Sequence, residues 1–299
     1  MTRPRASQAI HVEIGVVRTS LHTPIRAFRR QYTDLYRDCR IDQQPADAIQ
    51  IEVHRSPLSL RHRRRYQVFV NGRLRFEPTR FDEVLPYVEW SINWELARVV
   101  PQFLQLHASS LEVDGEGVIL PGVSGSGKST LTVGLMMRGW RYLCDEFALL
   151  NVDTLKLSPF PRAICLKKDS FPVAESLGIK LQGRRHHHKG TKGQVVFLNP
   201  QAVYRDSVGR ACPIRYVIFP TYTPGASPTL IPISRAEAAF NLHHVCFNLF
   251  GCQAPAAEVL AKMIREAACY RLISGDIGST CDLLQGLVEG QAAPQAQSA

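Results

Sequence analysis

The chemistry of this 299-residue chain is concentrated in one glycine-rich segment, Gly-Val-Ser-Gly-Ser-Gly-Lys-Ser at positions 122–129. The segment fits the phosphate-binding pattern G-x-x-x-x-G-K-[ST] at every position. Glycines let the backbone curl until several N–H groups face one anion, and a following helix adds its positive end. Lys128 can reach β- and γ-phosphates, and the Ser129 hydroxyl is a ligand for Mg²⁺. The sequence therefore predicts a site for ATP and Mg²⁺, with these nucleotide-binding residues: Gly122, Val123, Ser124, Gly125, Ser126, Gly127, Lys128, Ser129 and Thr130.

The segments on either side suit a phosphate loop. Residues 118–120 form an apolar run typical of a short buried strand, and residues 129–138 have the pattern of an amphipathic helix that ends at Gly139. A strand beginning near Arg141 then leads into Asp145 and Glu146. The acidic pair therefore follows the loop after a single helix, close enough to share one site with bound phosphates.

A short strand–helix–strand unit ending in an acidic pair is typical of HPr kinase/phosphorylase and its phosphoenolpyruvate-carboxykinase-like relatives. The chain resembles their core in Leu106-His107-Ala108-Ser109, Gly117-Val118-Ile119-Leu120-Pro121, Arg138-Gly139-Trp140-Arg141 and Leu143-Cys144-Asp145-Glu146. Other stretches are similar to the branch called HPr-kinase-related kinase A: Leu85-Pro86-Tyr87-Val88-Glu89-Trp90, Asn93-Trp94, Lys189-Gly190-Thr191 and Val217-Ile218-Phe219-Pro220. The resemblance extends over about residues 50–285.

The resemblance implies roles for individual residues. Asp145 matches the aspartate that accepts the proton of an attacking serine hydroxyl, although a carboxylate there can also serve only as an outer ligand of Mg²⁺. Lys128 is expected to act in catalysis on the phosphates. Glu146 is expected to help bind the metal together with Ser129, or else to pair with an arginine. His107 matches a site histidine, and its alternative role is that of an ordinary, partly buried histidine.

The resemblance also implies the reaction, which is transfer of the ATP γ-phosphate to a serine or threonine hydroxyl of a small protein or peptide. A PqqD-like carrier protein is the expected partner. The stretch 158–167 lacks the glutamate that the bifunctional enzymes carry there, so a kinase is favoured over a kinase/phosphorylase. Two alternatives remain open: a small-molecule kinase, and a nucleotide-dependent binding switch with slow hydrolysis.

Composition is that of a cytoplasmic protein. Hydrophobic residues make up 45% of the chain without forming a run long enough for a membrane span. The first five residues have no apolar signal region, so secretion is not expected. The eight cysteines include no C-x-x-C pair and are interpreted as reduced thiols. The sequence leaves formation of a homo-oligomer open.

The net charge of +10 comes partly from two basic clusters, at 61–65 and 184–189. Nucleic acid is not the expected partner, because aromatic residues are not interleaved with the charges. Three adjacent histidines, 186–188, cannot easily converge on one metal ion. We instead expect residues 183–193 to form a mobile flap near the active site, with 189–193 touching phosphate when it closes.

The predicted fold is α/β, a P-loop core of mixed sheet flanked by helices, of the HPr-kinase-like (phosphoenolpyruvate-carboxykinase-like) type, with a smaller N-terminal α+β extension. The expected domains are 1–100 and 101–290, followed by a disordered tail, 291–299. Turns are predicted at Asn71-Gly72 and Asp114-Gly115. The predicted helices are 81–99, 235–250 and 256–274, the first with Val84, Val88, Trp90, Ile92 and Trp94 largely on buried faces.

Overall fold

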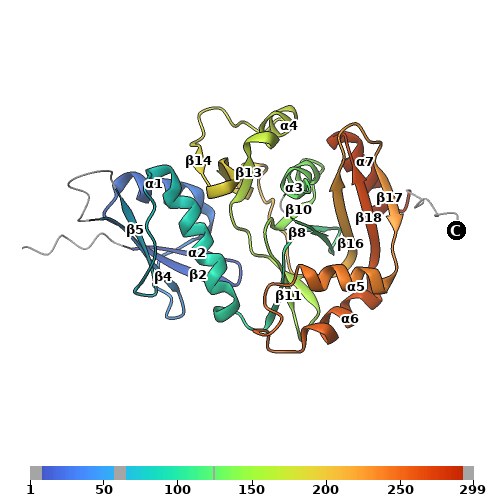
Figure 1. The fold of residues 1–299 in the computed structure, drawn as a ribbon, viewed down its shortest axis with the longest axis horizontal. Helices are drawn as coiled ribbons and strands as arrows, with labels where there is room; N and C mark the ends of the chain where they lie inside the picture. The colour runs from blue at the N-terminus through green and yellow to red at the C-terminus, as the bar shows by residue number, and fades with distance from the viewer. Residues whose placement is uncertain (1–8, 57–64, 124, 292–299) are drawn as a thin grey trace, which may run out of the picture.

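A computed structural model describes residues 9–56, 65–123 and 125–291. The chain folds into an N-terminal sheet with two helices, a larger central sheet covered by helices on both faces, and a small third sheet beside the phosphate loop (Figure 1). The expected basic cluster 61–65, apart from Arg65, and the expected tail, apart from Gln291, lie outside the described residues, as does Ser124. None of the helices in the described ranges is long and apolar enough to cross a membrane.

The N-terminal sheet has the strand order β3-β1-β2-β4-β5-β6 and is mixed, because β2 and β4 pair in parallel. Helix α1 connects these two strands and buries Phe28 and Tyr32, which are four residues apart and therefore on one face. The elements are β1 (Ile10–Ile14), β2 (Val17–His22), α1 (Arg26–Leu35), β3 (Arg40–Ile41), β4 (Ile49–Arg55), β5 (Tyr66–Val70), β6 (Arg73–Phe76) and α2 (Val84–Val99).

The central sheet contains nine strands, in the order β10-β8-β9-β16-β12-β11-β7, with β18 beside β16 and β17 beside β18. Strand β16 runs parallel to β9 and to β18, while the other pairs are antiparallel, so the predicted mixed sheet is confirmed. Its strands are β7 (Phe103–Leu106), β8 (Ala108–Val113), β9 (Glu116–Pro121), β10 (Arg141–Cys144), β11 (Ala148–Asn151), β12 (Lys156–Ser158), β16 (Cys212–Tyr222), β17 (Thr229–Pro232) and β18 (Ala268–Ser274).

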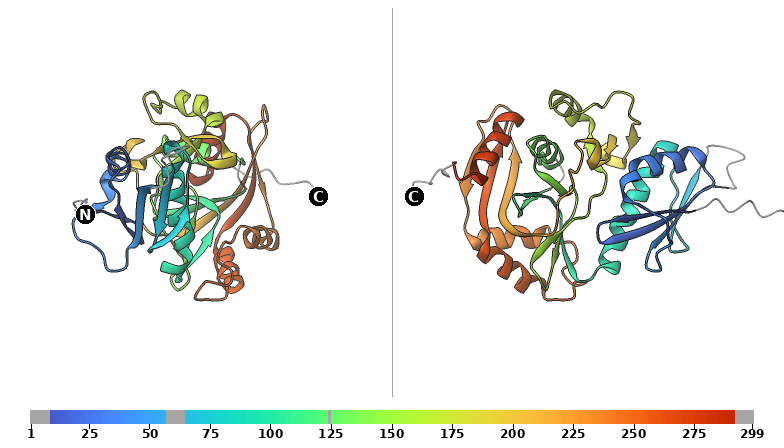
Figure 2. Two further views of the ribbon diagram at one scale, coloured as in Figure 1. Left: turned by 60° about the vertical axis from the view of Figure 1, so that its left-hand side comes forward. Right: turned by 180° about the vertical axis from the view of Figure 1, so that it is seen from behind.

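Helices cover both faces of this sheet, as the two views of Figure 2 show. Strand β9 illustrates the cause, since its alternate residues point to opposite faces. Val118 and Leu120 pack in the core with α3 and α7, and Ile119 packs in the core with α5 and α6. These helices are α3 (Lys128–Met136), α5 (Arg235–His244), α6 (Ala256–Glu266) and α7 (Ile277–Val288). The two cores hold the strand that precedes the phosphate loop from both sides.

The third sheet has the order β13-β15-β14 and lies beside the phosphate loop (Figure 1). It consists of β13 (Ile164–Lys167), β14 (His187–His188) and β15 (Gln194–Leu198), and the short helix α4 (Phe171–Ser176) follows β13. The predicted flap segment 183–193 therefore contains the edge strand β14, which pairs with β15 through His187 and His188.

Turns and a helix end that were predicted from the sequence are present in the structure. Asn71 and Gly72 both have positive φ, as do Asp114 and Gly115, which is the backbone of the type I′ turns expected between paired strands. Gly139 has a φ of 91° just after α3, where only glycine is unstrained. The strand, helix stop and strand predicted around the phosphate loop are confirmed.

The predicted burial of Trp90 and Trp94 is wrong. Val84, Val88 and Ile92 are fully buried, but Trp90 is 51% exposed and Trp94 is 60% exposed. The buried positions recur every four residues, and a residue two positions from Val88 or Ile92 lies on the opposite side of the helix. Trp90 instead packs on the outside, stacked at 5.6 Å against the ring of Phe76.

The predicted helix 256–274 is also wrong in its second half. Helix α6 ends at Glu266, and Ala268–Ser274 form β18, which pairs in parallel with β16 over seven residue pairs. The other predicted helix of this region, 235–250, ends early as α5 at His244. Neither α1 nor α7 was predicted, although Phe28 and Tyr32 of α1 have the four-residue spacing of one helix face.

The N-terminal sheet uses strands between residues 10 and 76, and the central sheet uses strands from residue 103 onward. The predicted division at residue 100 falls between the two sets. One hydrophobic core nevertheless joins them, since Val88 and Ile92 of α2 share a cluster with Phe147 and Phe160. The N-terminal part is thus packed against the half of the molecule that carries the phosphate loop.

Candidate active site

The phosphate loop connects β9 to α3. Gly125 and Gly127 have φ values of 99° and 88°, a backbone that other residues rarely adopt, and Gly127 immediately precedes the first turn of α3. A side chain at Gly122 would bring its Cβ to 2.9 Å from the Ser126 hydroxyl. The Lys128 Nζ donates to the carbonyl oxygens of Gly122 at 2.5 Å and of Val123 at 2.9 Å. The lysine is therefore folded back over the loop at the end where phosphates would lie.

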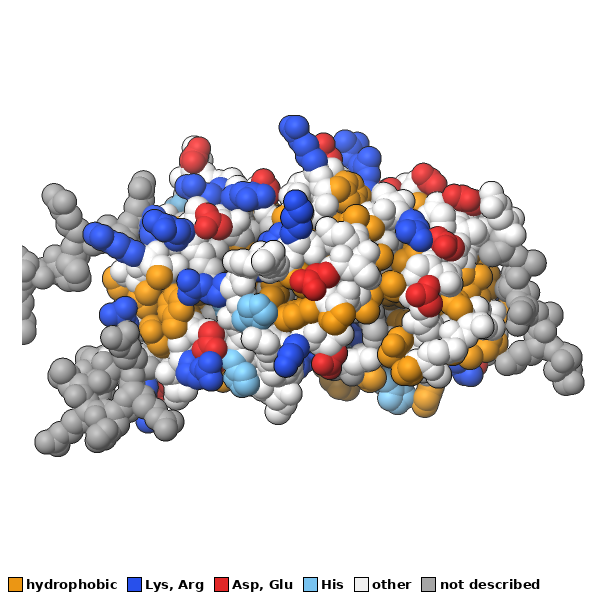
Figure 3. Space-filling view, turned by 90° about the horizontal axis from the view of Figure 1, so that it is seen from above, with side chains coloured by type: hydrophobic (Ala, Val, Ile, Leu, Met, Phe, Trp, Pro, Cys, Tyr) orange, Lys and Arg blue, Asp and Glu red, His pale blue; other side chains and the backbone are white. Residues whose placement is uncertain are grey.

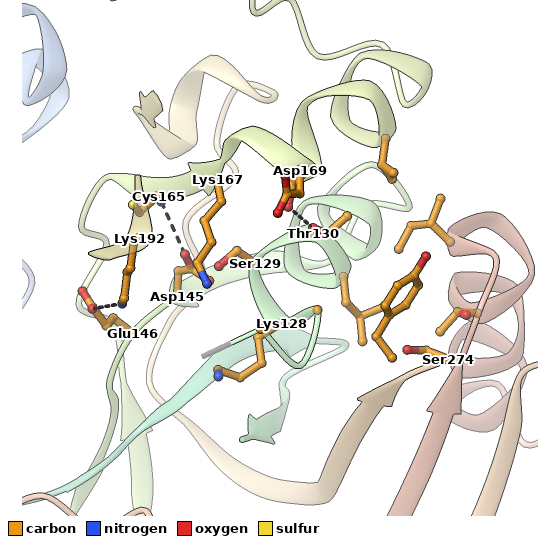
Figure 4. Close-up of a pocket in the computed structure, with 18 of the residues that line it drawn as sticks. Lys128, Ser129, Thr130, Asp145, Glu146, Cys165, Lys167, Asp169, Lys192 and Ser274 are labelled. Carbon is orange, nitrogen blue, oxygen red and sulfur yellow. Dashed lines mark hydrogen bonds and ion pairs between the residues drawn. The ribbon is translucent and has the colours of Figure 1, made fainter. Parts of the chain in front are cut away.

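A cavity of about 700 Å³ opens above the loop, between the third sheet and the start of α7 (Figure 4). Of the residues predicted from the sequence, those that line it are His107, Gly125, Gly127, Lys128, Ser129, Thr130, Asp145 and Glu146. Gly122, Val123 and Ser126 shape the loop without lining the cavity, and the Ser126 hydroxyl is buried without a hydrogen-bond partner among the described residues. The predicted site residues therefore converge on one cavity.

Asp145 lies just beyond the end of β10 and is 8% exposed. Its Oδ1 accepts a hydrogen bond from the Ser109 hydroxyl at 3.0 Å, and its Oδ2 accepts the backbone N–H of Cys165 at 3.4 Å. Burial raises the pKa of Asp145, and hydrogen bonds from Ser129 and Ser109 act in the opposite direction. The result is a buried carboxylate that accepts hydrogen bonds from hydroxyl and amide groups and lies beside the Ser129 hydroxyl.

Glu146 has opposite surroundings. Its carboxylate accepts a hydrogen bond from Asn93 at 3.0 Å and lies 3.4 Å from Arg162, 3.6 Å from Lys189 and 4.0 Å from Lys192. Burial alone would raise the pKa of Glu146, but the three cations and the amide outweigh it and lower this pKa to about 2. The arrangement matches the second of the two roles expected of Glu146, pairing with an arginine. A metal-binding role stays a prediction.

Arg162 connects the site to the N-terminal part. It is 3% exposed and forms a 2.6 Å ion pair with Glu89 of α2, whose backbone carbonyl it also contacts at 2.9 Å. A further hydrogen bond joins it to the side-chain oxygen of Asn93, one turn along the same helix. Since Glu89 and Asn93 are four residues apart, one face of α2 presents both to the arginine.

His107 occupies the break between β7 and β8 and lines the cavity. Its backbone N–H donates to Val245 at 2.7 Å, and its ring meets Phe147 edge to face at 6.1 Å. Burial, reinforced by Lys128, lowers the pKa of His107 to about 4. The imidazole is therefore neutral near pH 7, able to donate or accept one proton in a hydrogen bond but carrying no charge.

Four lysines from three segments line the cavity: Lys128, Lys167, Lys189 and Lys192. Lys189 and Lys192 belong to the segment predicted to touch phosphate, and here they lie beside Glu146. Burial is the main cause that lowers the pKa of Lys128 to about 8, and Asp145 opposes this effect. The concentration of cations around one cavity suits a polyphosphate ligand.

Sequence reasoning missed part of the cavity wall. Lys167 and Asp169 enter from the end of β13, where the sequence offered the missing glutamate as its only signal. Thr130 donates a hydrogen bond to Ser170 at 2.8 Å, which ties α3 to this wall. The opposite end of the cavity is formed by the ends of β16 and β18, the loops that follow them and the start of α7, none of which a motif marked: Tyr222, Gly225, Ser274, Asp276, Ile277 and Thr280.

The residues present fit a magnesium ion bound with phosphates. Ser129 and Asp145 supply neighbouring oxygen atoms in a hydrogen bond to each other, and oxygen is the donor that Mg²⁺ prefers. Within the described residues no cluster of three or more His, Cys, Asp or Glu could hold a metal on protein ligands alone. Mg²⁺ commonly uses one or two protein oxygens together with phosphate oxygens and water, so this sparse donor set is suitable.

No protein-family model matches this chain. The chain is 34% identical over 88 residues to HPr kinase/phosphorylase of Xanthomonas campestris pv. campestris, an alignment that covers 28% of this chain and 27% of that protein. It is 35% identical over 81 residues to HPr kinase/phosphorylase of Xylella fastidiosa, covering 26% of this chain and 24% of that protein.

Among solved structures, the Hpr(Ser) kinase/phosphatase from Coxiella burnetii aligns with a TM-score of 0.30 and 14% identity, over 62% of this chain and 94% of that chain. The superposition is too loose to support an inference. The sequence matches span about a quarter of the length of the curated relatives. Over that segment the chain is similar to HPr kinase/phosphorylases.

Proposed function

We propose that this protein is an ATP-dependent kinase that transfers the γ-phosphate to a serine or threonine hydroxyl of a small protein or peptide. The observation that carries the proposal is the convergence of Lys128, Ser129 and Asp145, with the lysine segment 189–192, on one cavity. Similarity to HPr kinase/phosphorylases over about a quarter of the chain supports the same reaction class. We also propose that the chain belongs to the branch called HPr-kinase-related kinase A.

The residues divide the work of phosphoryl transfer among them. Backbone N–H groups of the loop and the start of α3 would hold the phosphates, and Lys128 would move from the Gly122 and Val123 carbonyls onto the β- and γ-phosphates. Ser129 and Asp145 would hold Mg²⁺, which supplies charge neutralisation across the phosphates when bound. Asp145, which lies beside the Ser129 hydroxyl, would take the proton of the acceptor hydroxyl as its oxygen bonds to the γ-phosphorus and the bond from that phosphorus to the ADP oxygen breaks.

The reverse reaction, phosphorolysis of a phosphoprotein, is not part of the proposal. The wall that follows Arg162 presents Ala163, Cys165 and Lys167 to the cavity, and the first carboxylate along it is Asp169. Burial raises the pKa of the Cys165 thiol to about 11, so this side chain stays neutral. This wall of the cavity therefore offers few carboxylate ligands, which favours a kinase over a kinase/phosphorylase.

The test is incubation of the purified protein with γ-labelled ATP, Mg²⁺ and an extract of its own host. Wild type is compared with Asp145→Asn and with Lys128→Ala. A small labelled protein that forms with wild type and with neither variant is the expected result, and it would identify the acceptor. Binding of a fluorescent ATP analogue, measured in parallel, should survive in Asp145→Asn.

Other outcomes would overturn the proposal in distinct ways. Label confined to small molecules would identify a metabolite kinase on the same scaffold. Intact ATP binding with no transfer, together with a partner retained by the nucleotide-bound protein, would identify a binding switch. Equal labelling by wild type and Asp145→Asn would remove Asp145 from the proton transfer.

A further inference from the structure

A second cavity, which we call the distal cavity, lies between α1 and the segment that leads into β14. It measures about 350 Å³ and is lined by residues of α1, by Arg37 just after it, by Leu85 of α2, by Arg184, Arg185 and His187, and by Phe197, Asn199 and Ala202. Figure 3 shows the molecule from above the view of Figure 1. On this face, Lys and Arg side chains gather over the half that holds α1 and β14. The volume is within the range of small-molecule sites.

The lining of the distal cavity is strongly basic. It includes Arg30, Arg37, Arg184 and Arg185, against one carboxylate, Asp34. Arg37 lies 3.5 Å from Asp38, whereas Arg30, Arg184 and Arg185 form no ion pair with any residue that the structure describes. Burial and the nearby charge of Arg37 lower the pKa of Arg184. Like charges that face one space without counterions favour a bound anion.

Two of these side chains are already fixed by other contacts. Arg184 Nε donates to the carbonyl of Lys180 at 2.7 Å, and the Arg185 guanidinium lies 5.1 Å from the centre of the Phe81 ring. A planar guanidinium held in one orientation presents its remaining N–H groups as a fork, which matches the oxygens of a phosphate group better than a lysine does. The chemistry of the lining therefore favours phosphate over a larger, less charged ligand.

The floor of the distal cavity is a neutral histidine. His187 is 3% exposed, with Nδ1 3.1 Å from the Asp82 carbonyl and Nε2 2.8 Å from the Gln31 side-chain nitrogen. Since a carbonyl only accepts, Nδ1 carries the proton and Nε2 accepts from Gln31. The Gln31 carbonyl oxygen is left buried, without a partner among the described residues. This site thus has one unused acceptor beside its cluster of donors.

The distal cavity and the active-site cavity share one segment. Arg184, Arg185 and His187 line the first, while Lys189 and Lys192 line the second. Phe197 connects them as well, because its ring lines the distal cavity, meets His187 at 5.5 Å and lies 5.9 Å from the Lys189 Nζ. A ligand that binds Arg184 and Arg185 acts on the chain four to eight residues before the active-site lysines Lys189 and Lys192.

We propose that the distal cavity binds a compact phosphate-bearing anion, and that its occupancy sets the position of Lys189 and Lys192 in the active-site cavity. The first part stands independently, and the second rests on the proposed function. Anion binding would satisfy the unpaired arginines and hold β14 against α1. The lysines would then be fixed toward the nucleotide, so an anion at a distance would regulate transfer.

The binding test is calorimetric titration of inorganic pyrophosphate into the Lys128→Ala protein, in which the phosphate loop is disabled. Saturable binding of one pyrophosphate per chain is expected. Adding Arg30→Ala and Arg184→Ala should weaken this binding by about tenfold or more, because two charge-assisted contacts are lost. Removing two charges from the exposed face of α6, with Lys262→Ala and Arg265→Ala, should leave the affinity within about twofold.

Hydrogen exchange tests the coupling. Pyrophosphate should slow exchange of the backbone amides of residues 184–193 in Lys128→Ala, and this protection should vanish when Arg30 and Arg184 are also replaced. Absence of saturable binding, or equal binding with and without the two arginines, would overturn the site. Binding without protection of 184–193 would overturn the coupling. A separate ATP titration of wild type reports on the proposed function, so the two failures are distinguishable.

Discussion

Asp145 and Glu146 are neighbours in the chain but lie in two different regions of the site. The hydrogen-bond donors to Asp145 are hydroxyls and a backbone amide, and burial raises the pKa of the carboxyl. Around Glu146 the groups are an arginine, two lysines and an amide, and they lower its pKa to about 2 in spite of burial. Two carboxylates whose environments separate their pKa values are suited to different tasks.

The difference between the surroundings of Asp145 and Glu146 indicates which side of the active-site cavity can take part in the reaction. The Asp145 carboxylate faces the phosphate loop and forms a hydrogen bond with the Ser129 hydroxyl, so a proton or a metal can be accepted there. On the Glu146 side the charges neutralise one another and continue through Arg162 to Glu89 of α2. We interpret the Asp145 side as the reactive side and the Glu146 side as the structural connection between the N-terminal part and the core.

The largest expected effect is on the structural side. Arg162→Met should lower the free energy of unfolding by about 3–5 kcal/mol, because Glu89 would stay buried without its cation. Urea denaturation measures the change. Arg138→Met, which removes an exposed pair with Asp282, is the matched control and should cost less than about 1 kcal/mol. If the double change Glu89→Gln and Arg162→Met is no more stable than Arg162→Met, the buried charge is not the cause.

Glu146→Gln should lower stability by about 2–3 kcal/mol near pH 7. The folded pKa of about 2 is below the unfolded value, so the stabilisation is complete above the unfolded pKa and is lost as pH falls toward 2. Unfolding curves between pH 2 and pH 7 should therefore converge for wild type and variant at low pH. Glu116→Gln, at an exposed pair with Arg215, should change little. A constant difference at all pH values would contradict the ion-pair account.

Asn93→Ala tests the hydrogen bonds that connect α2 to both charged partners. We expect a loss of about 1–2 kcal/mol, since the amide bonds to Arg162 and Glu146 and is 8% exposed. The neighbouring Trp94→Ala changes a larger side chain that is 60% exposed, and it should have less effect. Thermal melting compares the two. A larger loss of stability for Trp94→Ala than for Asn93→Ala would contradict the proposal that the Asn93 face of α2 forms the stabilising contact with the core.

The smallest expected effect is a shift in the pH profile of transfer. Asp145 must be ionised to accept a proton, so the rate should fall about tenfold per pH unit below its raised pKa. The hydrogen bond from Ser109 lowers that pKa, and Ser109→Ala should move the acidic limb to higher pH. Ser110→Ala, at a buried hydroxyl without a partner among the described residues, should leave the limb in place. An acidic limb that stays in place in Ser109→Ala would contradict its assignment to Asp145.

Local sequence signals predicted the phosphate loop, its flanking strands and the two type I′ turns. These features depend on residues that are close together in the sequence. Gly125 and Gly127 are examples, because glycine adopts a positive φ more readily than other residues. Strand β18 was missed because its partner, β16, is about fifty residues earlier, and an apolar run after a helix reads equally well as more helix. Pairing with β16 makes this segment a strand, and the periodicity of its apolar residues does not reveal that pairing.

The site divides in the same way. Lys128, Ser129 and Asp145 were predicted because a motif and a short spacing place them. Arg162 was missed because its partners on α2 are about seventy residues away and no motif contains both. The far wall of the cavity includes Tyr222 at the end of β16 and Asp276 after β18, whose positions depend on the order of strands in the sheet. The role of Glu146 was left between two alternatives that only spatial neighbours separate.

The most direct test of the account compares Asp145→Asn with Glu146→Gln in single-turnover transfer from labelled ATP, with ATP affinity and melting temperature measured on the same samples. We predict that Asp145→Asn lowers the transfer rate by about 10²–10⁴ while affinity and melting temperature stay near wild type. Glu146→Gln should lower the melting temperature and keep most of the transfer rate at a temperature where it is folded. Transfer retained by Asp145→Asn and abolished in folded Glu146→Gln would contradict the account.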